Sequence, residues 1–163
     1  MPARSNNAGN DRRLGKGASA HAVQMRHIVL DTNCLLMIIP KISPYRVVWD
    51  GFMDNRFVLC VSNEIIEEYL EILTNKVGYH IATNVISTIL FSGNVKFITP
   101  YYKFNLIAAD ADDNKFVDCA IAANADYVVS EDAHFKVLDS IPFPHVNLLR
   151  LKAFADMIDV RHF

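Results

Sequence analysis

Residues 110–135 read DADDNKFVDCAIAANADYVVSEDAHF, and this stretch decides the fold. Small and apolar residues from Phe116 to Ala125 predict a helix, with Asp118 in the middle of the run. Tyr127 to Ser130 predicts a short buried strand, which Asp132 follows closely. A carboxylate in apolar surroundings is costly unless it is paired or neutralised. Asp118 is therefore predicted to face either a bound cation or water, and the segment alone leaves both open.

A further acid ends the first predicted strand. His27 to Leu30 form a short β run, and Asp31 follows it in the sequence Asp-Thr-Asn. Open α/β sheets bind their ligands at the carboxyl ends of strands, so Asp31 is a candidate site residue. Asn33 is close enough in sequence to orient Asp31 by a hydrogen bond. The alternative is an Asx turn that only closes the strand.

Strands and helices alternate along the rest of the chain. Ser43-Pro44 predicts a helix start, and Ser62 predicts the cap of the next helix. The apolar faces of these two helices carry Val47, Val48, Phe52 and Met53 on the first, and Ile65, Tyr69, Ile72 and Leu73 on the second. The further predicted strands are 56–61, 94–99 and 145–149, and the further helices are 80–90, 133–138 and 152–158. This alternation predicts an α/β fold, with a central, mainly parallel sheet and helices on both of its faces.

Composition indicates one folded domain, predicted over residues 25–160, because 52% of the 163 residues are hydrophobic. Residues 1–24 are rich in Ser, Asn, Gly, Ala and Arg and predict a disordered or extension tail. That tail is basic, and the remainder is more acidic than the net charge of −2 for the whole chain. An acidic domain argues against a general nucleic-acid coat but agrees with a nuclease whose acids gather at a metal site.

The cellular setting is predicted from what the sequence lacks. No apolar run approaches the ~20 residues of a membrane helix, and the N-terminus shows no signal-peptide core. We therefore expect a cytoplasmic protein with no membrane contact. Cys34, Cys60 and Cys119 lie in apolar patterns without CxxC spacing, and we expect them to be reduced core residues.

The strand-ending acids suggest a chemistry. Asp31, Asp118 and Asp132 fall at or near the ends of elements that meet at one edge of the predicted sheet. Hard oxygen ligands of this kind suit Mg²⁺ or Mn²⁺ rather than zinc. Clustered carboxylates around such ions are typical of phosphodiester hydrolysis, where the metal activates a water and stabilises the leaving oxygen.

In three motifs the sequence resembles the PIN-domain nucleases, and in particular their branch of toxin components of bacterial toxin–antitoxin pairs. The first is the strand with LDTN, which places the family's first acid on Asp31. The second is a strand, a Ser that opens a helix and an acid six residues later, which matches Ser62 and Glu68, with Glu67 as the alternative. The third is DDNKFVDCAIAANADYVVSED, residues 112–132.

The resemblance implies a Rossmann-like PIN domain with a divalent metal, Mg²⁺ or Mn²⁺. The metal ligands would be Asp31, Glu68, Asp118 and Asp132. Asp113 would be an additional catalytic acid at the mouth of the site and the N-cap of its helix. Asn33 and Ser130 would make supporting polar contacts, and Lys115 and Lys136 would bind substrate. His134, two residues after Asp132, is expected to be a surface or packing residue.

The resulting functional hypothesis is a metal-dependent endoribonuclease, the toxin of a toxin–antitoxin pair. Its implied partners are an RNA substrate, an antitoxin protein and a second copy of the chain in a homodimer. The alternative is a catalytically weak PIN-like module that acts by binding RNA or a protein. A haloacid-dehalogenase-type phosphatase also begins with a strand-ending Asp, but it needs a second Asp where this chain has Asn33.

Overall fold

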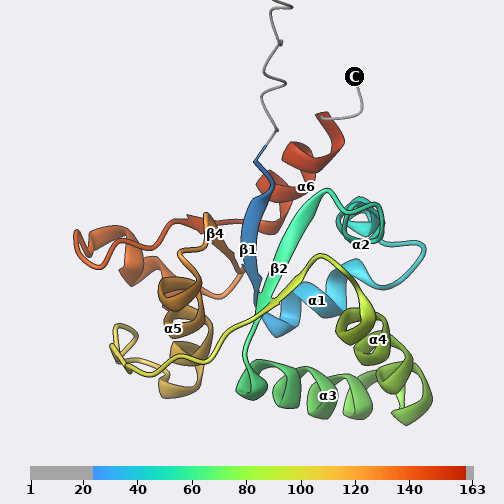
Figure 1. Cartoon of the computed structure of the whole chain (residues 1–163), viewed down its shortest axis with the longest axis horizontal. Helices are drawn as coiled ribbons and strands as arrows, with labels where there is room; N and C mark the ends of the chain where they lie inside the picture. Colours follow the sequence, from blue (N-terminus) through green and yellow to red (C-terminus); the bar gives the residue numbers. More distant parts are fainter. Residues whose placement is uncertain (1–23, 161–163) are drawn as a thin grey trace, which may run out of the picture.

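A computed structural model of the protein describes residues 24–160, and five parallel strands form its centre (Figure 1). The strands are β1 Arg26–Leu30, β2 Phe57–Val61, β3 Val95–Phe97, β4 Tyr127–Val129 and β5 Leu148–Leu149. Their order is β3-β2-β1-β4-β5. This Rossmann-like arrangement confirms the predicted α/β fold. The predicted tail lies, apart from residue 24, outside the described residues.

Helices cover both faces of the sheet. They are α1 Thr32–Ile38, α2 Arg46–Met53, α3 Asn63–Val77, α4 Tyr79–Phe91, α5 Asn114–Ala123 and α6 Leu151–Val160, with 3₁₀ helices η1 Ala111–Asp113 and η2 Ala133–Ser140. Helix α5 lies on one side of the sheet, and α1 and α2 lie on the other (Figure 1). None of the helices in residues 24–160 is long and apolar enough to cross a membrane.

Strand β1 is central because it pairs with β2 on one side and with β4 on the other. Its last three residues, 28–30, are buried, as expected for a strand covered on both faces. The strand order reverses between β1 and β4, since β2 and β3 follow on one side and β5 on the other. Such a switch point leaves a crevice beyond the carboxyl ends of the two strands.

Helix α3 follows the predicted capping and periodicity. The Ser62 hydroxyl accepts a hydrogen bond from the Ile65 backbone N–H at 3.3 Å, which caps the helix. Ile65, Tyr69 and Leu73 are fully buried, and the Tyr69 hydroxyl donates to the Leu30 carbonyl. This bond fixes α3 against the end of β1. The helix stops at Gly78, whose φ of 87° is readily adopted only without a side chain.

The first third of the chain differs from the sequence prediction in three details. Helix α1 was not predicted, because its Leu, Met and Ile run has no clear helical period and its burial comes from tertiary contacts. Helix α2 begins at Arg46 rather than at Ser43-Pro44, because the Ser43 hydroxyl accepts from the Tyr45 N–H at 3.1 Å and holds a turn before the helix. Met53, the last residue of α2, is exposed instead of packing with Phe52.

The core lies on both sides of the sheet and includes all three cysteines. Cys34, Cys60 and Cys119 are buried free thiols. Burial is the first cause that raises their pKa values, to about 12, 11 and 12 respectively. The predicted assignment as reduced core residues is confirmed.

Candidate functional site

The crevice between β1 and β4 brings Asp31 and Asp132 together. The Asp31 backbone N–H continues the strand ladder by donating to the Val129 carbonyl at 3.0 Å. The Ser130 hydroxyl, which is fully buried, donates to Asp31 Oδ2 at 2.8 Å and accepts from the Asp132 N–H at 3.0 Å. Ser130 therefore links the ends of the two strands and orients Asp31. Among the described residues Asn33 makes no hydrogen bond with Asp31, and both side chains line one hollow.

A hollow of about 840 Å³ opens above this edge of the sheet. Acids dominate its wall. The predicted site residues that line it are Asp31, Asn33, Glu68, Asp113, Lys115, Asp118 and Asp132. Glu64, Glu67, Glu71, Asp110 and Asp112 line it as well. Lys136 is exposed on η2 and is not among its lining residues.

Glu68 is turned into the site by two partners. Thr32 Oγ1 donates to Glu68 Oε1 at 2.6 Å, and Lys115 Nζ forms an ion pair with Glu68 Oε2. Glu67, the alternative from the sequence, is exposed. Burial lowers the pKa of Lys115, but the contact with Glu68 outweighs it and the net pKa is raised. Lys115 thus stays charged, and it both pairs with Glu68 and lines the hollow.

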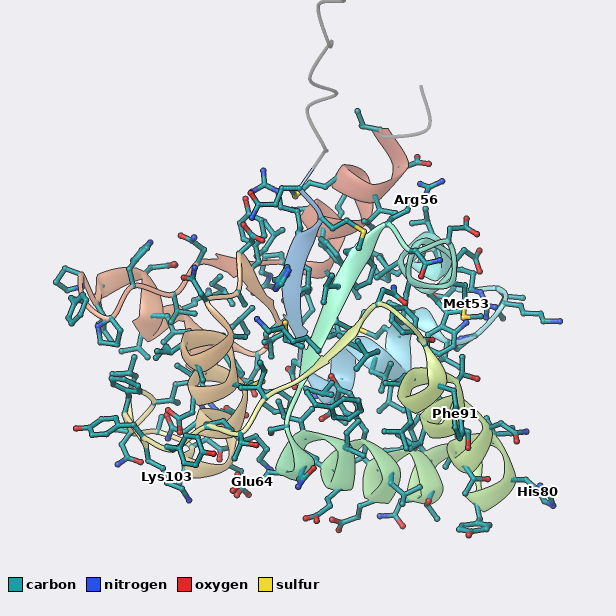
Figure 2. All side chains as sticks on the ribbon, viewed as in Figure 1. Met53, Arg56, Glu64, His80, Phe91 and Lys103 are labelled. Carbon is teal, nitrogen blue, oxygen red and sulfur yellow. The ribbon has the colours of Figure 1, made fainter. Side chains whose placement is uncertain are left out.

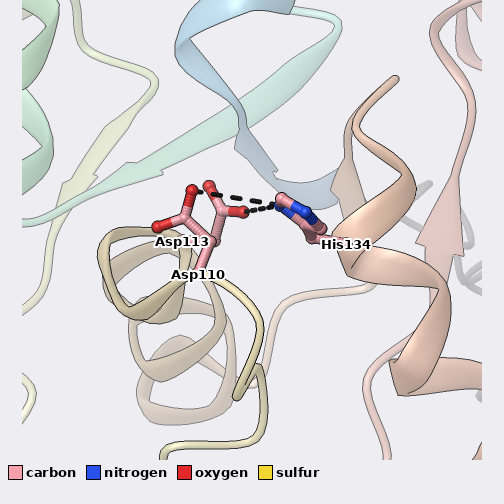
Figure 3. Close-up of side chains that lie close together, drawn as sticks. All are labelled: Asp110, Asp113 and His134. Atoms are coloured by element: carbon pink, nitrogen blue, oxygen red, sulfur yellow. Dashed lines mark ion pairs between the residues drawn. The ribbon is translucent and has the colours of Figure 1, made fainter.

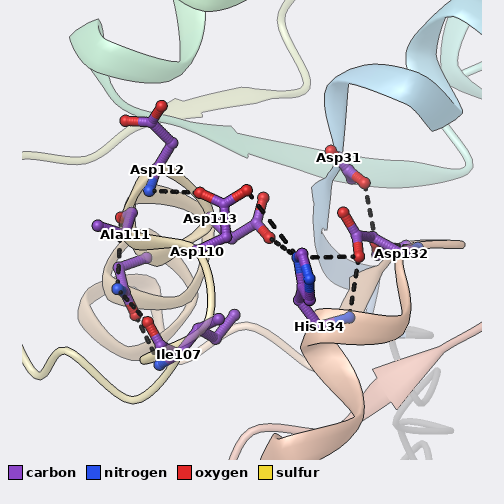
Figure 4. A network of polar contacts seen from close by, with 10 residues as sticks. Asp31, Ile107, Asp110, Ala111, Asp112, Asp113, Asp132 and His134 are labelled. Carbon is purple, nitrogen blue, oxygen red and sulfur yellow. Dashed lines mark hydrogen bonds and ion pairs between the residues drawn. The ribbon is translucent and has the colours of Figure 1, made fainter.

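His134 lies among three aspartates, two of which, Asp110 and Asp113, are drawn with it in Figure 3. Its Nδ1 is 3.4 Å from Asp132 Oδ1, 3.5 Å from Asp113 Oδ2 and 3.9 Å from Asp110 Oδ2. The ligand atoms of Asp110, Asp113 and His134 all lie within 4.8 Å of one another. Figure 4 shows this group beside Asp31 and Asp132. The sequence prediction of a surface or packing role for His134 missed this cluster.

Family and structure comparisons agree with this architecture. The family model described as PIN domain matches residues 27–134. This chain belongs to the PIN-domain family. The match begins in β1 and ends in the His134 cluster, so it spans every predicted site residue except Lys136.

Solved structures with the PIN-domain fold of this chain include two protein complexes. VapBC2 from Rickettsia felis, bound to a DNA fragment from its promoter, is 16% identical at a TM-score of 0.55, over 76% of this chain and 98% of that one. VapBC-1 from nontypeable Haemophilus influenzae is 13% identical at a TM-score of 0.53, over 77% of this chain and 98% of that one. At such identities the likeness shows the fold alone. A comparison with curated proteins gave no match.

Asp113 in the PIN domain is less easily ionised than an ordinary aspartate. Burial, followed by the charges of Asp110, Asp132 and Asp31, raises its pKa to about 6, although His134 lowers it. Its Oδ2 atom is buried and makes no hydrogen bond. Asp113 also occupies the N-cap position of α5, but its side chain makes no capping hydrogen bond, so that predicted structural role was wrong. Its carboxylate faces the acid cluster instead.

Asp118 in the PIN domain has different surroundings. The residue is only 7% exposed, so the alternative that it points to water was wrong. Its Oδ1 accepts from the Phe104 backbone N–H at 3.1 Å. Burial raises the pKa of Asp118, while Phe104 and Lys103 lower it and Glu64 raises it. Asp31, by contrast, has a pKa raised by burial first and then by Glu68 and Asp132. The charges of Asp132 and Asp31 thus act on Asp113, whereas those acting on Asp118 are Lys103 and Glu64.

Asn114 holds the loop that carries Asp110 and Asp113. Its buried side chain accepts from the Ile107 N–H at 2.9 Å and donates to the Ile107 carbonyl at 2.9 Å. Sequence reasoning missed this residue, as it missed Thr32, Asp110 and the contacts of His134. The sequence feature that could have identified them is their position, since each of them lies within three residues of a predicted site acid.

Replacing Asn114 by Ala is expected to lower the free energy of unfolding by about 2–3 kcal/mol, because both backbone groups of Ile107 lose their partner. Asn114→Asp keeps the acceptor for the Ile107 N–H but sets a buried carboxylate against the Ile107 carbonyl, so it should lose at least as much. Urea unfolding measures both, with Asn75→Ala on the exposed side of α3 as the matched control. An Asn114→Ala protein as stable as the control would contradict this role.

Proposed function

We propose that this PIN domain is a metal-dependent endoribonuclease. The observation that carries the proposal is that Asp31, Asp113 and Asp132 line one hollow at this edge of the sheet, with Ser130 linking Asp31 to Asp132. Family membership supports the same reaction class, hydrolysis of phosphodiester bonds. The acids belong to separate segments of the chain, so the fold rather than a local sequence pattern assembles them.

The donor set fits a hard divalent cation, Mg²⁺ or Mn²⁺. All three central acids offer carboxylate oxygens, the ligands that such ions prefer. The buried Oδ2 of Asp113 supports the fit, because it makes no hydrogen bond and has only the ion-pair contact with His134 Nδ1 at 3.5 Å. When bound, the ion activates a water and stabilises the leaving oxygen. Asp31, Asp113 and Asp132 would hold it, and Glu68 and Asp118, which also belong to the predicted ligand set, line the same hollow.

Neighbouring side chains prepare the site for a phosphodiester. Ser130 keeps the Asp31 carboxylate turned toward the hollow by its hydrogen bond. Glu68 holds Lys115 at the rim, where the ammonium group is placed to contact a phosphate oxygen. Lys136 lies away from the lining residues, so in our proposal it contributes at most to a remote part of the substrate.

The direct test is cleavage of single-stranded RNA by the purified protein. We expect cleavage in Mg²⁺ or Mn²⁺ and none in chelator, with products mapped by end-labelling. The alternative, a PIN-like module that acts only by binding, predicts metal binding without cleavage of any RNA. Cleavage that persists in chelator would contradict the proposed mechanism.

A toxin role in a toxin–antitoxin pair is the biological setting we propose, with cytoplasmic localisation. Support comes from the fold likeness to the VapBC complexes of Rickettsia felis and Haemophilus influenzae. The expected partner is a small antitoxin protein, and self-association into a homodimer is expected too. Co-expression with the product of a small adjacent reading frame should yield a stable complex and suppress the growth defect caused by this chain alone.

A further inference from the structure

A second, smaller pocket of about 210 Å³ adjoins the acidic hollow. Glu64, Lys103, Lys115 and Asp118 line both cavities and form their shared border. Glu64 and Lys103 lie at the same edge of the molecule (Figure 2). The far wall of the small pocket contains Ile98, Thr99 and Pro100, and Asn63 adds an amide. The pocket is below the ~300–1,000 Å³ of sites for whole small molecules, so it suits one flat group of a larger ligand.

Two exposed tyrosines lie in the segment next to this pocket, although neither of them lines it. Tyr101 is 94% exposed and Tyr102 is 67% exposed, and both lie between the lining residues Pro100 and Lys103. The Tyr102 ring meets the Phe104 ring edge-on, with 4.6 Å between the ring centroids. Exposed aromatic rings in a group mark interaction sites on soluble proteins. Tyr101 and Tyr102 are therefore candidates for a ligand-binding role, next to Lys103 and the small pocket.

The backbone beneath the tyrosines is fixed to α5. The Phe104 N–H donates to Asp118, and Ile107 exchanges two hydrogen bonds with Asn114. These bonds anchor the segment on both sides of Asn105, a residue with a φ of 51°. The tyrosine rings are therefore presented from an anchored segment next to the acidic hollow.

We propose that Pro100–Phe104 and the small pocket form a base-binding subsite for a single-stranded nucleic acid. Unpaired bases stack on Tyr101 and Tyr102, and one base enters the pocket. The phosphate that follows lies between Lys103 and Lys115 at the border of the acidic hollow. Stacking is available to every base but not to bases already paired in a duplex. The subsite deepens the proposed function and rests on it for the identity of the substrate.

Stacking also answers an electrostatic difficulty. The hollow is lined largely by carboxylates, which repel a phosphodiester backbone, and Lys103 and Lys115 are its two lining cations among the described residues. Base stacking adds affinity that does not depend on charge. The tyrosines would thus hold the strand where the acids alone would not.

The test is binding of a short labelled single-stranded RNA, measured by fluorescence anisotropy in Mg²⁺. All proteins carry Asp31→Asn to prevent cleavage. Adding Tyr101→Ala and Tyr102→Ala together is expected to raise the Kd by about 10-fold or more. Phe91→Ala is the control, since this ring is 90% exposed on α4, far from Lys103 (Figure 2), and should leave the Kd unchanged. Both tyrosines are exposed, so the variants should melt as the parent does.

An RNA of the same length with abasic sugars separates stacking from phosphate contacts. The parent should bind it at least as weakly as the double-tyrosine variant binds normal RNA, and the variant should distinguish the two RNAs much less than the parent does. Equal affinity of parent and variant for normal RNA would overturn the subsite and point to a protein-contact surface. Tyrosine-dependent binding together with a wild-type protein that cleaves no RNA would keep the subsite and reject the nuclease proposal.

Discussion

Asp31→Asn is expected to lower the rate of RNA cleavage by more than about 100-fold while the protein stays folded. Even outer partners of metal ligands cost about 10–100-fold when mutated, and Asp31 belongs to the proposed inner set. The asparagine oxygen can still accept from the Ser130 hydroxyl, so the link between β1 and β4 persists. Initial cleavage rates and thermal melting of the same preparation measure both effects.

Two variants make the Asp31 result specific. Asp156→Asn removes a carboxylate from an exposed ion pair with Lys152 on α6 and should leave the rate unchanged. His134→Ala should keep most of the rate, because a metal-assisted reaction does not need a histidine base. An Asp31→Asn protein as active as Asp156→Asn would mean that the proposed mechanism is wrong.

Metal binding is expected to raise the melting temperature by roughly 5–10 °C at a concentration about 100-fold above the Kd. The reason is that Mg²⁺ or Mn²⁺ relieves the repulsion among Asp31, Asp113 and Asp132 only in the folded state. Asp113→Asn should melt at or above the wild-type temperature in chelator and gain much less from metal. Asp118→Asn should retain more of the gain, because its surroundings differ from those of the central acids.

The pH dependence follows from the pKa of Asp113, which rises from an ordinary value of 3.8 to about 6 in the folded protein. Between these values the folded state keeps a proton that the unfolded state releases. In chelator, stability should therefore fall as the pH rises through this window, and Asp113→Asn should reduce the fall. The gain from metal should be larger at about pH 7.5 than at about pH 5, where protonated Asp113 is a poor ligand. A gain independent of pH would contradict an Asp113 ligand.

The surroundings of several predicted site residues depend on tertiary contacts that the sequence does not reveal. The apolar helix left Asp118 open between a cation and water, and the family resemblance made it a ligand; in the structure its Oδ1 accepts from the Phe104 N–H of a loop that no helical period describes. Asp113 was predicted at the mouth of the site, and its carboxylate lies with Asp110 and His134 near Asp132. Lys115 was predicted to bind substrate, and the structure pairs it with Glu68. The contacts of Asp118 with Phe104, of Asp113 with His134 and of Lys115 with Glu68 each join two segments that are separated in the sequence.

The alternation of strands and helices, apart from α1, could be predicted from the sequence, as could the parallel sheet and the acids that follow β1 and β4. These features depend on local periodicity, on caps such as Ser62 and on the burial of strands, all of which neighbouring residues encode. Only the tertiary structure decided which acids meet, because that depends on how β1, β4, α3 and α5 pack around one switch point. The same packing decided that Ser130 rather than Asn33 orients Asp31, since distances between elements are fixed by the whole core.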